Sequence, residues 1–106
     1  MNIIRQTEHF KHWLKTLKDI QAKAAILKRL KRMESGLFGD CKSIGGGLFE
    51  MRVDVGKGWR VYYFRQGETV YLLIHGGNKS GQQADIDAAH KIKQSIERAG
   101  NGNGTI

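Results

Sequence analysis

The spacing of apolar side chains along this chain changes once, from a helical period to an alternating one. Residues 2–6 favour a short extended segment. Thr7 then provides a helix N-cap, with Glu8 in the first turn, where the helix dipole favours an acid. The large apolar residues that follow recur every three or four positions, which predicts an amphipathic helix. They are Phe10, Trp13, Leu14 and Leu17.

A second helix is predicted directly after the first. Asp19 provides its N-cap and Gly36 its end, because glycine tolerates the left-handed conformation that terminates helices. Its apolar stripe consists of Ala22, Ala25, Ile26, Leu30 and Met33. The other faces of the two helices are basic, at Lys11, Lys15, Lys18, Lys23, Lys28, Arg29, Lys31 and Arg32. We therefore expect a helical hairpin that packs through one side and presents its cations to solvent.

Beyond a glycine-rich joint at residues 44–47, the side chains alternate as they do in β-strands. Three strand candidates follow, at residues 48–54, 59–65 and 69–75. Their connections are short and contain glycine, so consecutive strands must run antiparallel as a meander. Ser80 and Gln83 suggest a capping box for a last helix, whose apolar side holds Ile86, Ala89, Ile92 and Ile96. The expected order is β-α-α-β-β-β-α, an α+β fold with helices covering one face of a sheet.

The length of 106 residues fits one domain, which we expect to span residues 1–99. Glycine and asparagine alternate from Gly100 to Gly104, so residues 100–106 are expected to form a flexible tail. No apolar run reaches the roughly 20 residues that a membrane-spanning helix needs, and the start lacks an apolar stretch of signal-peptide length. A single cysteine, Cys41, gives neither a disulfide nor a zinc cluster. The sequence thus predicts a cytoplasmic protein with no membrane association.

The charge balance narrows the choice of partners. Eighteen Lys and Arg against ten Asp and Glu give a net charge of +8, which favours a polyanion or an acidic protein. His9 and His12 share a helix face and are interpreted as exposed polar residues. The histidines lack metal-ligand spacing, and no phosphate-binding loop or pair of catalytic carboxylates occurs. We therefore expect neither a metal nor another cofactor.

The remaining candidates for chemistry are cations on and between the strands, namely Arg52, Lys57, Arg60 and Lys79. Aromatic side chains and a histidine lie among them, at Trp59, Tyr62, Tyr63 and His75. A cluster of that composition can hold a phosphodiester and stack a base. Alternatively, Arg52 and Arg60 form cross-strand ion pairs with Glu50 or Asp54. Both interpretations fit the spacing.

Three motifs in the strand half form one longer series. They are E-x-R-x-D at residues 50–54, G-x-R-V-Y-Y at 58–63 and G-G-x-K-S-x-Q-x-x-D-I at 76–86. The series resembles the RelE/ParE toxin superfamily, and within it the HigB-like branch, also called phage Gp49-like or addiction-module killer proteins. The resemblance extends from about residue 3 to 98. It implies a RelE-like fold, in which a helical hairpin and a C-terminal helix pack on the antiparallel meander.

The resemblance also implies a function, that of the toxin in a type II toxin–antitoxin pair. RelE- and HigB-like toxins are ribosome-dependent, metal-independent endoribonucleases that cut mRNA in the decoding site. The 2′-hydroxyl attacks the adjacent phosphate, which requires a proton acceptor, a proton donor and cations on the phosphorane. The implied partners are mRNA on the ribosome and a cognate antitoxin. In this branch the antitoxin is usually a HigA-like helix-turn-helix protein encoded beside the toxin.

The family's functional positions transfer to individual residues of this chain. Arg60 matches the arginine that faces the scissile phosphate, Lys79 the basic position after the last strand, and Arg52 another basic residue of the same sheet. The general base stays open among Lys79, His75 and Tyr62. The side chains expected to bind RNA around them are Lys57, Trp59, Tyr63 and Gln82.

Two other functions stay open at this point. A ParE-type toxin shares the fold but inhibits DNA gyrase by binding it, and a non-catalytic nucleic-acid-binding domain would use the same basic face. The K-S-x-Q element and the pair Arg52 and Arg60 favour the nuclease.

Overall fold

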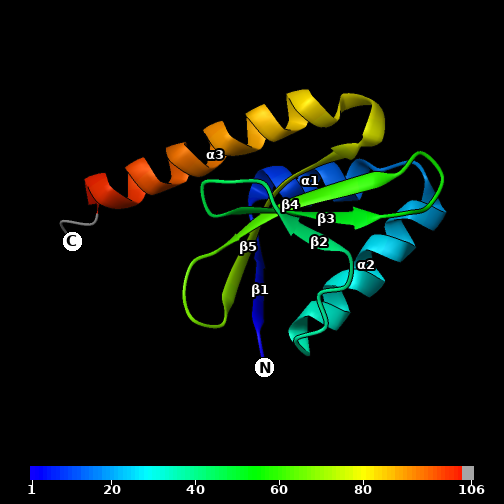
Figure 1. Cartoon of the computed structure of the whole chain (residues 1–106), viewed down its shortest axis with the longest axis horizontal. Coiled ribbons are helices and arrows are strands. Elements are labelled where there is room, and N and C mark those ends of the chain that lie inside the picture. The colour runs from blue at the N-terminus through cyan, green and yellow to red at the C-terminus, as the bar shows by residue number, and fades with distance from the viewer. Residues whose placement is uncertain (104–106) are drawn as a thin grey trace.

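In the computed structural model, which describes residues 1–103, one open sheet lies between helices on its two faces (Figure 1). The five strands are β1 (Ile3–Gln6), β2 (Cys41–Ser43), β3 (Leu48–Val53), β4 (Trp59–Arg65) and β5 (Val70–Asn78). The helices are α1 (Glu8–Thr16), α2 (Ile20–Glu34) and α3 (Gln82–Asn103), the last preceded by the 3-10 turn η1 (Lys79–Gly81). The predicted α+β class is confirmed.

The strands lie in the order β1-β5-β4-β3-β2. The predicted meander of β3, β4 and β5 is confirmed, since both pairings are antiparallel. β1 adds to β5 in parallel, with Ile3 beside Val70, so the start of the chain completes one edge of the sheet. The other edge is β2, an unexpected strand that pairs antiparallel with β3. The expected element order therefore lacked one short strand.

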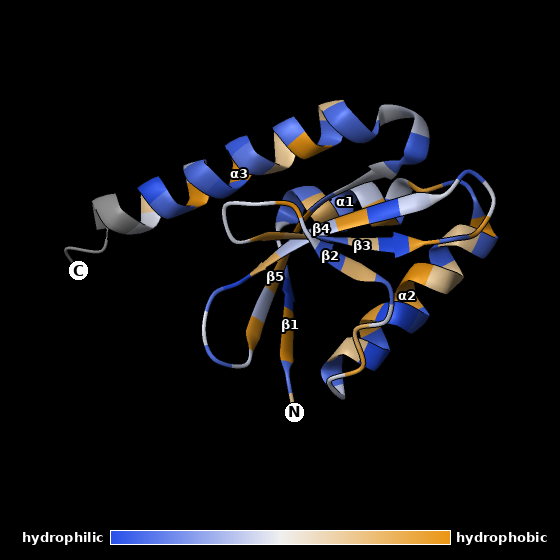
Figure 2. Ribbon diagram, in the orientation of Figure 1, coloured by the Kyte–Doolittle hydropathy of each residue, from blue (hydrophilic) through white to orange (hydrophobic). Residues whose placement is uncertain are grey.

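Helices cover both faces of the sheet, and the expectation that they cover one face was wrong. Six of the seven residues of β4 are buried, because its two sides pack against different helices. Val61 and Tyr63 join the core formed with α1 and α2. Tyr62 and Phe64 join a second core with α3. Apolar and polar residues alternate along the helices, as amphipathic packing on a sheet requires (Figure 2).

Local signals fixed two of the helix starts. Phe10 N donates to Thr7 Oγ1 at 3.1 Å, and Ala22 N donates to Asp19 Oδ1 at 3.0 Å, which confirms both predicted caps. The start of α3 differs from the expected capping box, because Asn78 Oδ1 accepts the hydrogen bond from Ser80 N at 3.0 Å.

Helix α3 continues to Asn103 and so includes residues 100–103 of the expected tail. Residues 104–106 of that tail lie outside the part of the chain that the structure describes. Within the described residues, none of the helices combines the length and the apolar character needed to cross a membrane.

Candidate active site

Arg60 lies on the α3 side of β4 and is only 8% exposed. Its Nε atom is 3.9 Å from Oε1 of Glu50, a fully buried carboxylate on the neighbouring strand β3. Its Nη1 donates to the carbonyl oxygen of Trp59 at 3.1 Å. Burying a charge is costly unless an opposite charge lies near, so Glu50 is what allows an arginine at this position. The cross-strand ion pair that the sequence left open is therefore present for Arg60.

Glu50 is itself fixed by two other elements. Its Oε2 accepts hydrogen bonds from the Tyr62 hydroxyl at 3.0 Å and from Nε2 of Gln82, the first residue of α3, at 2.9 Å. Burial, and then the bond to Glu50, raise the pKa of Tyr62 above its ordinary value. Tyr62 is thus a protonated donor to Glu50 and not a proton acceptor, while Gln82 supports the carboxylate instead of facing a ligand.

Arg52 stands beside Arg60 across the β3–β4 ladder but has a different acidic partner. Its Nε and Nη2 atoms both donate to Asp40 Oδ1, at 3.2 and 3.0 Å. A hollow of about 260 Å³ opens between these groups, lined by Asp40, Arg52, Asp54 and Arg60. The cation of Arg52 is more than one-third exposed, so its contact with Asp40 is readily exchanged for a ligand.

Lys57 and Lys79 line a second hollow of about 450 Å³, together with Asn78 and Ser80. Gly58 lies next to a side chain from each hollow. A Cβ atom at Gly58 would lie 3.6 Å from Nη1 of Arg60 and 3.5 Å from Cβ of Lys79, so both side chains approach this glycine. The Lys79 amide also donates to the Gly58 carbonyl at 2.7 Å. The structure therefore brings the four predicted cations together around the β3–β4 turn, and we call Arg52, Lys57, Arg60 and Lys79 the cationic cluster.

Trp59 and Tyr63 do not join the cationic cluster. They occupy the alternate positions of β4 and point toward α1 and α2, where they are 7% and 2% exposed. The Trp59 ring packs 6.2 Å from the Trp13 ring, and the Tyr63 ring packs 5.5 Å from the Phe49 ring. Both aromatic side chains expected to stack on RNA are thus core residues.

His75 lies across from Tyr62 on β5, and both of its ring nitrogens are engaged. Nε2 is 2.9 Å from Asp85 Oδ1 on α3, and Nδ1 is 3.0 Å from Nε2 of His9 on α1. A base needs a free nitrogen, so His75 in this arrangement is a bridge between two helices. Sequence reasoning missed His9, because 66 positions separate it from His75 and no local pattern links them.

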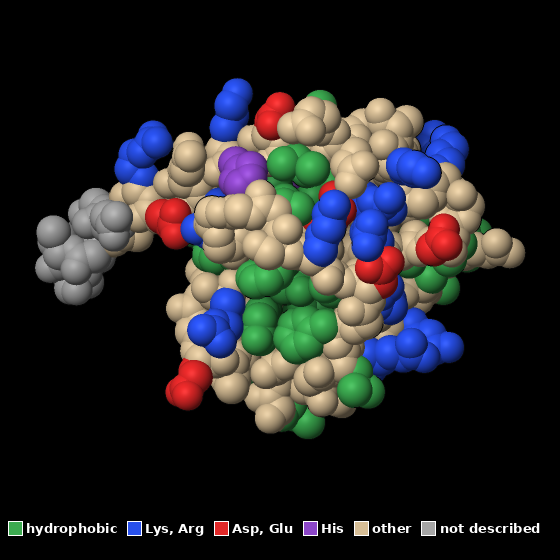
Figure 3. Space-filling model, in the orientation of Figure 1, with side chains coloured by type: hydrophobic (Ala, Val, Ile, Leu, Met, Phe, Trp, Pro, Cys, Tyr) green, Lys and Arg blue, Asp and Glu red, His purple; other side chains and the backbone are tan. Residues whose placement is uncertain are grey.

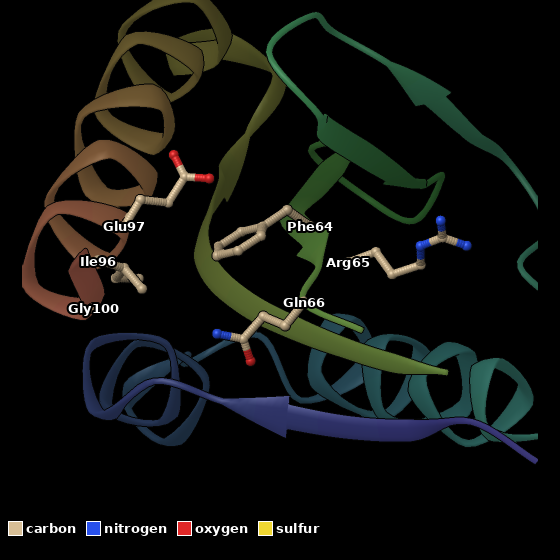
Figure 4. A pocket seen from close by; sticks show the side chains of 6 residues that line it. All are labelled: Phe64, Arg65, Gln66, Ile96, Glu97 and Gly100. Carbon is tan, nitrogen blue, oxygen red and sulfur yellow. The ribbon is translucent and has the colours of Figure 1, made fainter. Parts of the chain in front are cut away.

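A further hollow of about 550 Å³ lies between the end of β4 and the second half of α3 (Figure 4). It is lined by Phe64, Arg65, Gln66, Ile96, Glu97 and Gly100, and contains no predicted site residue. Across the described residues, no three His, Cys, Asp or Glu side chains are grouped closely enough to hold a metal ion.

Most of the chain, including the cationic cluster, matches a family of known proteins. Residues 12–97 match the family model described as phage derived protein Gp49-like. The chain belongs to the Gp49-like family. An uncharacterized protein of Haemophilus influenzae is 44% identical over 93 residues, which cover 88% of this chain and 94% of that relative. No solved structure matches the chain. The Gp49-like match includes every residue of the cationic cluster, together with Glu50 and Gln82, whereas His9 lies before it.

Proposed function

We propose that this Gp49-like protein is the toxin of a type II toxin–antitoxin pair and acts as a ribosome-dependent, metal-independent endoribonuclease on mRNA. The observation that carries the proposal is the cationic cluster around Gly58, in which Arg60 is paired with the buried carboxylate of Glu50. Several cations that converge on one place suit a phosphodiester as ligand. The described residues contain no group of side chains that could hold a metal ion there. The RelE-like arrangement of helices and sheet is part of the same proposal.

The cluster suits stabilisation of developing negative charge. With a phosphate seated at Gly58, Arg60 and Lys79 lie on two sides of it, and Arg52 faces it from the neighbouring strand. As the 2′-hydroxyl attacks, these fixed cations stabilise the charge on the phosphorane oxygens without having to reorganise. The products are a 2′,3′-cyclic phosphate and a free 5′-hydroxyl. Among the three proposed proton acceptors, Lys79 is the one that is exposed and lies beside Arg60.

The partners proposed for this toxin are mRNA on the ribosome and a HigA-like helix-turn-helix antitoxin. A net charge of +8 supports both, since ribosomal RNA and an acidic antitoxin are each attracted to a basic protein. The proposed compartment is the cytoplasm, where ribosomes and the antitoxin meet the toxin.

The test is cleavage of a defined mRNA by the purified protein on programmed ribosomes, with Arg60→Ala beside the wild type. We expect the variant to lose about 100-fold or more in rate, because a preorganised donor to the transition state is removed. Arg65→Ala is the matched control, since Arg65 is exposed at the far end of the same strand. Equal cleavage by Arg60→Ala and wild type, or no cleavage by wild type, contradicts the proposed function.

Induction in cells separates this function from its alternatives. Translation should stop first after induction of the wild type. Replication stopping first, with induction of the SOS response, indicates a ParE-type gyrase inhibitor instead. Unimpaired growth indicates a non-catalytic nucleic-acid-binding domain.

A further inference from the structure

An open groove lies on the face of the sheet opposite the cationic cluster and at its other end. It consists of two adjoining hollows of about 290 and 470 Å³, which share Phe49 and Tyr71. The first is lined by Phe38, Gly39, Cys41, Lys42, Ser43, Phe49, Tyr63 and Tyr71, and the second by Gly47, Phe49, Arg65 and Tyr71. We call these two hollows the aromatic groove.

Four aromatic rings form the floor of this groove as one continuous contact. The Phe49 and Tyr63 rings are 5.5 Å apart, the Tyr63 and Tyr71 rings 6.1 Å, and the Tyr71 and Phe38 rings 5.1 Å. Figure 3 shows hydrophobic side chains in an open hollow on the lower half of the molecule, with basic side chains at its margins. Open clusters of aromatic rings of this kind are typical of protein interfaces, where they supply the largest energies per residue.

The charges at the groove indicate what it receives. Arg65 lines the second hollow and lies in register with Tyr71 on the face of the groove. Lys42 belongs to the strand that borders the first hollow, but it lies in register with Glu50 and thus on the other face of the sheet. None of the residues lining the two hollows is an Asp or Glu. The lining also includes all of β2, a terminal strand whose outer backbone edge has no neighbouring strand in the sheet. An extended acidic segment with large apolar side chains fits such a surface, because it gains a backbone edge, an aromatic pocket and a countercharge.

We infer that the aromatic groove docks an acidic segment of a partner protein, which inserts aromatic or long aliphatic side chains between Phe49 and Tyr71. A protein fits better than RNA, since the rings pack edge-on or face one another within the floor and a single cation, Arg65, faces the groove. The inference rests on the proposed function for the identity of the partner, which is the antitoxin. It separates the surface that binds the antitoxin from the cluster that binds mRNA.

The experiment measures the dissociation constant of the complex between the full chain and the protein encoded beside it. Reversal of the groove charge, Arg65→Glu, should weaken the complex at least tenfold. Arg98→Glu makes the same change in net charge at an exposed position of α3 and should alter binding less than twofold. Equal losses for the two variants, or no loss for Arg65→Glu, overturn the inference, because the charge of the groove would then contribute nothing of its own.

A second variant tests the apolar part of the groove. Tyr71→Ala should also weaken the complex at least tenfold, with unchanged cooperative melting as the criterion that the chain remains folded. Unchanged partner binding with weakened ribosome binding by Arg65→Glu would assign the groove to RNA and overturn the inference. Failure of the wild type to bind the neighbouring protein overturns the inference and the proposed antitoxin together. The mRNA cleavage assay tests the proposed catalytic function separately.

Discussion

Two glycines in β5 let different helices approach opposite faces of one strand. A Cβ atom at Gly76 would overlap the Trp13 ring of α1, and one at Gly77 would overlap the Asp85 carboxylate of α3. Glycine is therefore required here for close approach, with no positive φ at either position. The approach at Gly77 places Asp85 within reach of His75, which ties α3 to the sheet.

We expect Gly77→Ala to lower the free energy of unfolding by about 2 kcal/mol, because the new methyl group must displace Asp85 and break its contact with His75. Gly67→Ala is the matched control, since a Cβ at Gly67 would make only an ordinary 3.7 Å contact with Val70. Urea denaturation of both variants measures the difference. Equal stabilities would show that α3 moves away without cost.

Tyr62 and Tyr63 predict how stability responds to alkali. Burial raises the pKa of both from the ordinary 10.0, helped by the bond to Glu50 for Tyr62 and by the bond to Cys41 for Tyr63. Above pH 10 the unfolded chain loses these protons while the folded chain keeps them, so stability is intact below that pH and falls as pH rises. The slope approaches about 1.4 kcal/mol per pH unit for each tyrosine at about pH 11, where the unfolded chain is almost fully ionised, and is about half of that at pH 10.

The measurement is the free energy of unfolding between about pH 9 and pH 11. Tyr62→Phe and Tyr63→Phe should each remove about half of the slope that these two tyrosines contribute, whatever their effect at neutral pH. An unchanged slope in both variants would mean that other groups cause the alkaline loss.

At the scale of elements, Arg29 connects α2 to the entrance of the sheet. The sequence places it among the solvent-facing cations, yet its guanidinium donates to the carbonyl oxygens of Arg52 at 2.6 Å and Phe38 at 3.0 Å. A third, longer bond reaches the Asp40 carbonyl at 3.3 Å. Arg29 therefore holds the segment between α2 and β2 against the end of β3, where the cationic cluster begins.

Arg29→Ala should lower the free energy of unfolding by about 2–3 kcal/mol, since three carbonyl oxygens lose a charged donor. Arg32→Ala, an exposed arginine on the same helix, should change it by less than about 0.5 kcal/mol. Thermal and urea denaturation of the two variants give the comparison. Similar free energies of unfolding for the two variants would mean that Arg29 contributes no more to stability than an exposed cation.

Elements with local signals could be predicted from the sequence, and elements that depend on distant partners could not. The caps at Thr7 and Asp19 act within three residues, so their residue types sufficed. Strand β2 has three residues with only one partner strand, which is too little pattern to recognise. The face on which α3 packs depends on the path of the chain after β5, and periodicity carries no information about that path.

Some features of the candidate site could likewise be predicted from the sequence and others could not. The four cations could be selected by residue type, and the meander brings them together as expected. Trp59 and Tyr63 were misassigned because β4 is buried on both sides, so its alternation gives no clue to which side faces a ligand. The support of Glu50 by Gln82 joins residues 32 positions apart and required the structure.

At the scale of the whole molecule, the exposed basic residues of α2 line neither the hollows of the cationic cluster nor those of the aromatic groove. Lys28, Lys31 and Arg32 are all exposed, and the contact of Lys31 with Glu34 at 3.7 Å is a surface pair of little energy. Cations of this kind gain affinity for a phosphate surface through release of counterions.

Under the proposed function, reversal of Lys28, Lys31 and Arg32 to glutamate should weaken association with ribosomes and make its salt dependence shallower than that of wild type. The position at which mRNA is cut should stay the same, because these residues line neither hollow of the cationic cluster. Co-sedimentation with ribosomes at two salt concentrations measures the effect. Equal association of variant and wild type would mean that these α2 residues do not bind the ribosome and that the cationic cluster alone does.

Because β1 pairs with β5, the sheet can form completely only after β5 has been synthesised. Residues 3–6 leave the ribosome before their strand partners, residues 70–73. Gln82, which donates a hydrogen bond to Glu50, follows later still. Strand β1 must therefore wait for β5 before it can join the sheet, and the cationic cluster acquires its full support only once α3 has begun to emerge. A chain whose synthesis has not passed residue 82 is thus structurally unfinished at its candidate site.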